Sequence, residues 1–510
     1  MTQKRSARKA AKAALADTGA QTFDAWSPAV EADGDGPSQS PTDPFARRRR
    51  RGESLPAGAV GARPIVAIIG RPNIGKSTLF NRLAGAHLAI VEDVAGVTRD
   101  RHYADTFLHG REMVLVDTGG FDPESDDPMR EGIARHVRAA LEEADVVVCV
   151  LDATLGATDA DRAAVQLLRI ANKPVVFVAN KADSHAQALE SSQLYELGMD
   201  KIVAISALHG NNITNLEQAI VDVLPEVDQG RAITWSEEVY RVSIVGRPNA
   251  GKSSLTNRLL GEDRQLVDHR PGTTVDPIDS LLTRPDKRGG EDKQYVLIDT
   301  AGIRRKRGID EAVESVAVMK AIRSMERSDC VVLLVDAAEG IAEQDARLVG
   351  LAMDRGRAVV IGLNKADLLD EAGRIHALER ARDTLAFAPW ARIVLLSAKT
   401  GRATSKILDA VDMAIASHRA RVTTSELNRF FEEVLEHHPP PTARGKPVRL
   451  YYVTQAETRP PRFVAVTNEP EIIHFSYERY IQNALRERFG FEGTPIRITY
   501  RSKNKQDKAF

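Results

Sequence analysis

Short apolar runs alternate with helix-like segments through most of the chain, and the whole alternation occurs twice. The first series begins with IVAII and continues through MVLVD, VVVCVLD, PVVFVAN and KIVAIS, ending near Leu224. The second series starts again at YRVSIV and continues through YVLID, CVVLLVD, AVVIGLN and RIVLLS to about His418. Alternating strands and helices are typical of a mostly parallel sheet with helices on both faces, so the pattern predicts two tandem α/β domains.

The two ends of the chain follow other patterns. Beyond the second series, the sequence predicts a helix, two strands, a second helix and a last strand, which together form a small α+β unit with a basic tail. The start of the chain lacks aliphatic periodicity and is predicted to be disordered; its run Arg47–Arg51 either binds RNA phosphates or is only a solvated tail. The predicted organisation is an arm at 1–61, a first domain at 62–226, a linker at 227–239, a second domain at 240–420 and a C-terminal domain at 421–510.

Composition narrows the function classes. The chain has 510 residues and a formal net charge of −1, which argues against a uniformly basic nucleic-acid binder. Its two cysteines, Cys149 and Cys330, lie in equivalent apolar runs and are predicted to be buried thiols rather than a disulfide or metal ligands. No apolar run reaches membrane-spanning length and no signal peptide precedes the first domain, so we expect a cytoplasmic protein without a membrane partner.

The same phosphate-binding loop occurs once in each α/β series. GRPNIGKS and GRPNAGKS both follow a predicted strand and precede a predicted helix, the arrangement in which backbone N–H groups surround a phosphate. In such loops the lysine reaches the β- and γ-phosphates and the serine ligates Mg²⁺. The predicted phosphate-binding residues are Gly70, Arg71, Pro72, Asn73, Ile74, Gly75, Lys76 and Ser77, and Gly246, Arg247, Pro248, Asn249, Ala250, Gly251, Lys252 and Ser253.

A second repeated motif, NKAD, selects the base. Each copy follows an apolar strand, at the carboxyl edge where ligands of such sheets bind. A carboxylate that accepts hydrogen bonds from N1–H and the 2-amino group reads guanine, whereas adenine would leave it unpaired. We therefore predict guanine recognition by Asp183 and Asp367, with a backbone N–H of each Ser-Ala pair near the guanine O6. The predicted base-binding residues are Asn180, Lys181, Ala182, Asp183, Ser206 and Ala207, and Asn364, Lys365, Ala366, Asp367, Ser397 and Ala398.

The segments between these motifs are candidate switches. DTGG and DTAG each follow a strand; the aspartate is expected to hold Mg²⁺ through water, and the N–H of the last glycine to contact the γ-phosphate. An upstream threonine, Thr98 or Thr274, can close on Mg²⁺ when the γ-phosphate is present, and Thr273 is an alternative in the second copy. These motifs add Asp117, Thr118, Gly119, Gly120 and Phe121, and Asp299, Thr300, Ala301, Gly302 and Ile303. The predicted metal ligands are Ser77, Thr98, Asp117, Ser253, Thr274 and Asp299.

With these ordered motifs, residues 63 to 500 resemble the bacterial Der (EngA) family of tandem-GTPase ribosome-assembly factors. The resemblance implies two P-loop GTPase domains packed around a KH-like domain, with GTP, GDP and Mg²⁺ as ligands. It also implies that Asn73 and Asn249 help to bind K⁺ in place of an arginine finger, since Phe121 and Ile303 occupy the place of a water-orienting glutamine. The predicted catalytic residues are Lys76, Asn73, Thr98, Gly120, Lys252, Asn249, Thr274 and Gly302.

The resemblance further implies a GTP-hydrolysing ribosome biogenesis factor that acts on the large ribosomal subunit and its rRNA. We expect a monomer whose nucleotide state controls docking. A tRNA-modification GTPase, a membrane-coupled GTPase and an ATPase are the rival interpretations. In the C-terminal domain, GFEG at Gly490–Gly493 is expected to end a helix rather than to clamp RNA, because a strand and not a helix follows it. The candidate RNA-contacting residues are Arg444, Lys446, Arg449, Arg497 and Arg501.

Overall fold

The computed structural model describes the chain in several stretches. They are residues 63–85, 103–118, 137–138, 140–171, 173–225, 239–262, 279–285, 292–299, 314–440, 442–443 and 446–502. The predicted arm and nearly all of the predicted linker lie outside the described residues. Among the helices that are described, none combines the length and the hydrophobicity that a bilayer crossing requires.

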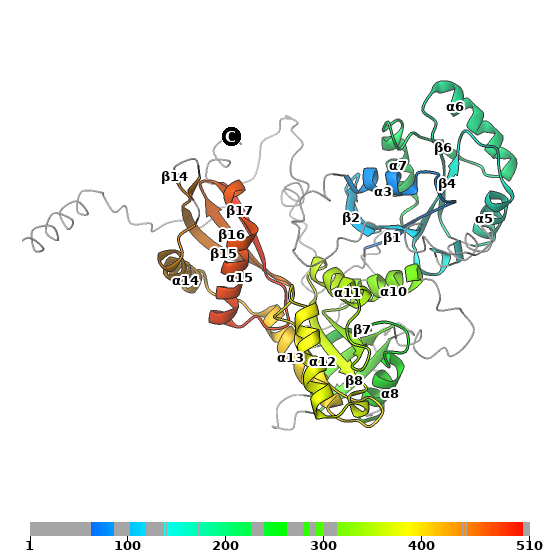
Figure 1. Ribbon diagram of the computed structural model, residues 1–510. Coiled ribbons are helices and arrows are strands. Elements are labelled where there is room, and N and C mark those ends of the chain that lie inside the picture. The colour runs from blue at the N-terminus through cyan, green and yellow to red at the C-terminus, as the bar shows by residue number, and fades with distance from the viewer. Residues whose placement is uncertain are drawn as a thin grey trace, which may run out of the picture. The chain divides into compact units, whose positions relative to one another are not determined.

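The first domain is built on a six-stranded sheet with the strand order β2-β3-β1-β4-β5-β6. All neighbouring strands are parallel except β2 and β3, which pair antiparallel. Its central strands, β1 and β4, are buried along their whole length because helices cover both faces of the sheet (Figure 1). The elements are β1 (Ile65–Ile69), α3 (Lys76–Ala84), β2 (Tyr103–Leu108), β3 (Arg111–Asp117), β4 (Val146–Asp152), α5 (Asp159–Ile170), β5 (Val175–Asn180), α6 (His185–Glu190), η3 (Ser191–Leu197), β6 (Ile202–Ala204) and α7 (Ile213–Val223).

The second domain repeats this topology strand for strand. Its sheet has the order β12-β11-β10-β7-β9-β8, in which only β8 and β9 pair antiparallel. The prediction of two mostly parallel α/β domains is therefore confirmed. The elements are β7 (Val239–Val245), α8 (Lys252–Glu262), β8 (Ser280–Arg284), β9 (Lys293–Ile298), α10 (Glu314–Arg327), β10 (Cys330–Asp336), α11 (Glu343–Asp354), β11 (Ala358–Asn364), η4 (Ala366–Leu368), α12 (Glu371–Thr384), β12 (Arg392–Leu395) and α13 (Thr404–Arg419).

The C-terminal domain is an α+β unit, as predicted. Its sheet has the order β15-β16-β17, with one antiparallel and one parallel pairing. The helices α14 and α15 lie beside this sheet (Figure 1), and their apolar side chains form a separate core with it. The elements are α14 (Thr424–His437), the short pair β13 (Thr442–Ala443) and β14 (Lys446–Pro447), β15 (Leu450–Thr458), β16 (Pro461–Thr467), η5 (Pro470–Ile472), α15 (Phe475–Phe489) and β17 (Arg497–Ser502).

The GFEG string connects the C-terminal domain to the second α/β domain. Gly490 ends α15 as predicted, with φ 86° and its N–H bound to the Arg486 carbonyl at 2.8 Å. Gly493 donates its N–H to the Trp390 carbonyl at 2.9 Å and accepts a hydrogen bond from the Val359 N–H at 2.7 Å. A Cβ added at Gly493 would lie 2.5 Å from the Ala414 Cβ. This string is therefore a close backbone contact between two domains.

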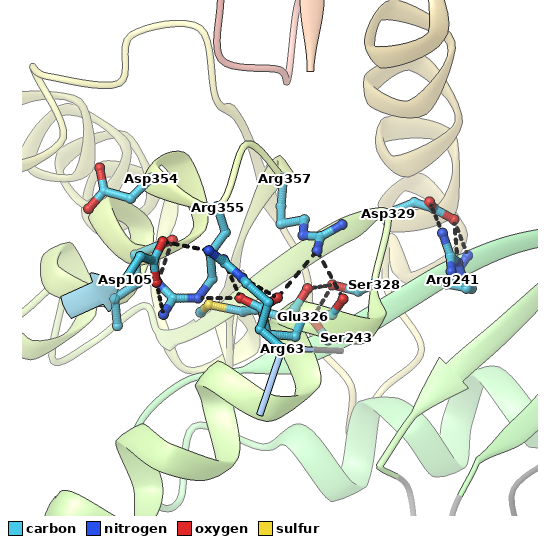
Figure 2. Close-up of polar contacts among 12 residues, drawn as sticks. Arg63, Asp105, Arg241, Ser243, Glu326, Ser328, Asp329, Asp354, Arg355 and Arg357 are labelled. Atoms are coloured by element: carbon cyan, nitrogen blue, oxygen red, sulfur yellow. Dashed lines mark hydrogen bonds and ion pairs between the residues drawn. The ribbon is translucent and has the colours of Figure 1, made fainter. Parts of the chain in front are cut away.

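Ion pairs at α10 and in the segment after α11 connect the two α/β domains. Arg63 of the first domain donates to both Glu326 carboxylate oxygens, at 3.1 and 2.7 Å, and also pairs with Asp105 at 2.9 Å. From the second domain, Arg355 approaches Glu326 at 3.0 Å and Asp105 at 3.5 Å. Arg357 lies 3.9 Å from the same glutamate. Figure 2 shows these side chains directed toward one another, and we call them the ionic junction.

Candidate functional site

The phosphate loops of the two domains have the same backbone conformation. In both domains the loop joins the central parallel strand to a helix that begins at the lysine. The asparagines Asn73 and Asn249 have φ values of 63° and 61°, and the glycines Gly75 and Gly251 have φ values of 88° and 96°. A left-handed conformation at these positions turns the chain sharply and aims successive N–H groups into one concavity, which is the geometry that binds a phosphate.

The first glycine of each loop lies against the neighbouring strand. A Cβ at Gly70 would be 2.5 Å from the Val150 carbonyl oxygen, and a Cβ at Gly246 would be 2.1 Å from that of Leu334. Such distances leave no room for a side chain, so only glycine permits this approach of backbone to backbone. The loop is thereby fixed at the carboxyl end of the central strands.

The asparagine of each NKAD motif binds two other motifs. Asn180 donates to the Ile74 carbonyl at 2.7 Å and accepts from the Ala207 N–H at 2.9 Å. Asn364 makes the equivalent bonds with Ala250 at 2.8 Å and Ala398 at 2.9 Å. Both asparagine side chains are buried, so these hydrogen bonds are shielded from water. The predicted phosphate loop, NKAD and Ser-Ala motifs are thus one connected unit in each domain.

The carboxylates predicted to read guanine lie beside the Ser-Ala pair. The Ser206 hydroxyl donates to Asp183 at 2.5 Å. In the second domain the Ser397 hydroxyl lowers the pKa of Asp367 below its usual value, which keeps that group ionised. An ionised carboxylate is acceptor-only and matches the two donors of guanine.

The lysine of each NKAD motif has an acidic partner that the sequence analysis missed. Lys181 pairs with Asp152 at 2.7 Å, and Lys365 pairs with Asp336 at 2.6 Å. Both aspartates end the strand before the NKAD strand, directly beside the motif's asparagine. The Asp-Ala pair that is repeated at the end of each of these strands was the available sequence signal.

The loop lysines donate hydrogen bonds to carbonyl oxygens of their own loops. Lys76 donates to the Arg71 carbonyl at 2.7 Å, and Lys252 donates to the carbonyls of Gly246 and Arg247, both at 2.8 Å. Burial lowers the pKa of Lys76, and the nearby Asp117 offsets part of this effect. A negatively charged phosphate in the loop would favour the protonated lysine further.

Two of the predicted Mg²⁺ ligands lie together in the first domain. The Ser77 hydroxyl donates to Asp117 at 2.7 Å, and this aspartate is fully buried at the end of β3. A hydroxyl and a carboxylate fit Mg²⁺, which prefers a few protein oxygens completed by phosphates and water. In the second domain Asp299 has φ 60°, and its backbone N–H donates a hydrogen bond to the Asp279 carboxylate at 3.0 Å.

Several predicted switch residues lie outside the described residues. They are Thr98, Gly119, Gly120, Phe121, Thr274, Thr300, Ala301, Gly302 and Ile303. Arg444 of the candidate RNA-contacting set also lies outside them. Another member of that set, Arg497, donates to the Asp354 carbonyl, so its guanidinium is directed at the second α/β domain.

Comparison with known proteins gives consistent matches over most of the chain. A family model described as "50S ribosome-binding GTPase" matches residues 65–181 and 241–365, and one described as "KH-domain-like of EngA bacterial GTPase enzymes, C-terminal" matches residues 421–501. GTPase Der of Moorella thermoacetica is 44% identical over 86% of this chain and 98% of its own length. GTPase Der of Citrifermentans bemidjiense is 44% identical over 87% of this chain and 100% of its own length.

Proposed function

Because the chain belongs to the GTPase Der family and is a GTPase, we propose that it is a ribosome biogenesis factor whose nucleotide state controls docking on the large ribosomal subunit. The observation that carries this proposal is the duplicated site. In each domain the phosphate loop, the NKAD motif and the Ser-Ala pair are linked by the same two asparagine hydrogen bonds. Two such sites in one chain suit a factor with several nucleotide states better than a single-step hydrolase.

Each site provides binding and positioning rather than a covalent step. The loop N–H groups and the helix N-terminus hold the β-phosphate. Lys76 and Lys252 exchange their loop carbonyls for phosphate oxygens when nucleotide enters. Ser77 and Asp117 would hold Mg²⁺, which balances the charge of the phosphates when bound. Asp183 and Asp367 select guanine, so an ATPase is the less favoured interpretation.

We also propose that K⁺ accelerates hydrolysis at both sites. The side chains that follow the DTGG and DTAG motifs, Phe121 and Ile303, have no polar atom that could orient the attacking water. Asn73 and Asn249 are exposed at the same turn of the two loops, where an amide oxygen can face a cation beside the phosphates. Loss of a charge stabiliser of this kind costs on the order of 10³-fold in rate. Equal turnover in sodium and potassium buffers would exclude this role.

The docking proposal is tested by sedimentation with ribosomal particles in GTP, a non-hydrolysable GTP analogue and GDP. We expect binding of a large-subunit particle that depends on the nucleotide. Lys76→Ala and Lys252→Ala, measured in parallel, are expected to impair binding differently, because the sequence after DTGG is acidic (FDPESDD) and the sequence after DTAG is basic (IRRKRG). Absence of binding to every large-subunit particle in all three nucleotide states would refute the ribosomal role and leave the GTPase activity unaffected. We expect a cytoplasmic protein that is a monomer. Sedimentation of the protein alone will check the oligomeric state.

A further inference from the structure

The arginine after the first glycine of each phosphate loop binds a buried aspartate. The Arg71 Nε donates to Asp161 at 2.9 Å, and the Arg247 Nε donates to Asp345 at 2.8 Å. The aspartates are 3% and 0% exposed, so both arginines are held by a buried charge. Hydrogen bonds between charged groups in such surroundings are the strong ones.

Each of these aspartates is itself fixed in the first turn of a helix. Asp161 accepts from the Thr158 N–H at 3.1 Å and from the Thr158 hydroxyl at 2.7 Å, at the start of α5. Asp345 accepts from the Ala342 N–H at 3.0 Å, at the start of α11. The carboxylate therefore has a rigid place in the fold, and the arginine bound to it gains the same rigidity.

The arginine also supplies the backbone carbonyl that binds the loop lysine. The carbonyl of Arg71 accepts the Lys76 ammonium at 2.7 Å, and the carbonyl of Arg247 accepts that of Lys252 at 2.8 Å. Moving the arginine would therefore move the acceptor of the lysine and the N–H groups on either side. We propose that Arg71 and Arg247 are positioning residues. Each arginine holds its phosphate loop in the conformation that binds nucleotide, through Asp161 in the first domain and Asp345 in the second. This inference rests on the proposed nucleotide sites.

The two tethers differ in strength. Arg247 also donates to the Gly340 carbonyl at 3.0 Å and lies 3.3 Å from the Glu339 carboxylate. The Nη2 of Arg71 is buried and has no hydrogen-bond partner among the described residues. In the first domain Leu155, which is 53% exposed, stands where the second domain has Glu339. The first loop is therefore held by fewer bonds than the second.

Loop positioning predicts a specific kinetic effect. A loop that is ordered in advance improves the binding of GDP and of GTP to the same degree, so loss of the tether should weaken both nucleotides equally. We expect Arg71→Met to weaken GDP and GTP at the first site by roughly tenfold, equivalent to about 1.4 kcal/mol. Arg247→Met is expected to have a larger effect at the second site, since it removes more bonds.

The test uses the full chain and fluorescent GDP in calorimetric and stopped-flow binding assays. Lys252→Ala isolates the first site, and Lys76→Ala isolates the second. Leu155→Glu supplies the carboxylate that the first domain lacks, and we expect it to tighten GDP binding by roughly threefold, which is about 0.65 kcal/mol. The same substitution is expected to have no effect when Arg71→Met is also present, because the new carboxylate then has no guanidinium to bind.

The outcomes separate this inference from the proposed function. The inference would be overturned if Leu155→Glu still tightened GDP binding in the Arg71→Met background. It would also be overturned if both arginine variants bound GDP as the unsubstituted chain does and had unaltered melting temperatures. A fall in melting temperature with unchanged affinity would make the pairs merely structural, which also overturns the inference. GDP binding needs no ribosome, so failure to dock on a ribosomal particle leaves this test valid. Failure of the unsubstituted chain to bind two GDP would instead refute the proposed sites.

Discussion

Glu326→Gln is expected to destabilise the contact between the two α/β domains. Glu326 is 2% exposed and faces three guanidinium groups of the ionic junction, those of Arg63, Arg355 and Arg357 (Figure 2). Glutamine keeps the shape and one acceptor oxygen but removes the charge. Arg355 would then be left buried, at 8% exposed, with the half-exposed Asp105 as its remaining carboxylate partner among the described residues.

The size of the effect follows from the burial of the junction. Removing one partner of a buried ion pair costs about 3–5 kcal/mol, because the other charge remains buried without compensation. The lower end of this range applies here, since the amide retains one acceptor and Arg63 keeps Asp105 at 2.9 Å. We therefore expect a loss of about 3 kcal/mol in the opening free energy of this interface.

The assay must report on the interface, because a chain of several domains does not unfold in a single two-state transition. Native-state hydrogen exchange of β2 and α10, the strand and helix on its two sides, provides that local measure. The matched control is Glu343→Gln, which removes a solvent-exposed partner of Arg347 on α11. That control is expected to cost only about 0.3–0.5 kcal/mol. A change for Glu326→Gln no larger than the control would refute the reasoning.

Three further predictions concern the junction, the domain contact and the sites. Burial would raise the pKa of Glu326, but the neighbouring arginines outweigh this effect and hold the pKa below its ordinary value. The ionic junction should therefore be most stable above the ordinary pKa of a glutamate and should weaken as the pH falls through the lowered pKa. Hydrogen exchange at decreasing pH will measure this loss. Gly493→Ala places a methyl group 2.5 Å from Ala414 at φ 72°, and should lower the stability of the second α/β domain and the C-terminal domain by about 1–3 kcal/mol in thermal unfolding. Asn180→Ala and Asn364→Ala each leave a buried carbonyl and N–H unpaired, and should weaken GDP binding at their own site by about tenfold or more; an effect on the other site only would contradict this assignment.

The edge strands illustrate what the sequence pattern could not predict. β2 (YADTFL) and β8 (SLLTR) lie at the outer edges of their sheets and pair antiparallel, and neither stood out as an apolar run. β2 alternates half-buried and buried positions, because only one of its faces meets the core. Runs of apolar residues identify strands buried on both faces, such as β4 and β10, and overlook strands of this kind.

The sequence by itself determined the two phosphate loops. Their glycines and asparagines take the same left-handed conformations in both domains, because such turns depend on local residues that tolerate positive φ. The NKAD and Ser-Ala motifs were predictable for a related reason: each follows a strand, and parallel strands present their carboxyl ends at one edge of the sheet.

Only the tertiary structure decided which charges meet. Arg63, Asp105 and Glu326 are far apart in the chain, and no local pattern distinguishes them from solvated surface charges. The same holds for Arg71 and Asp161, which the fold brings within 2.9 Å. The GFEG string, which has the letters of an RNA clamp, instead contacts the second α/β domain. A charge or a short motif acquires its role from its neighbours in space, and those neighbours are fixed only when the domains pack.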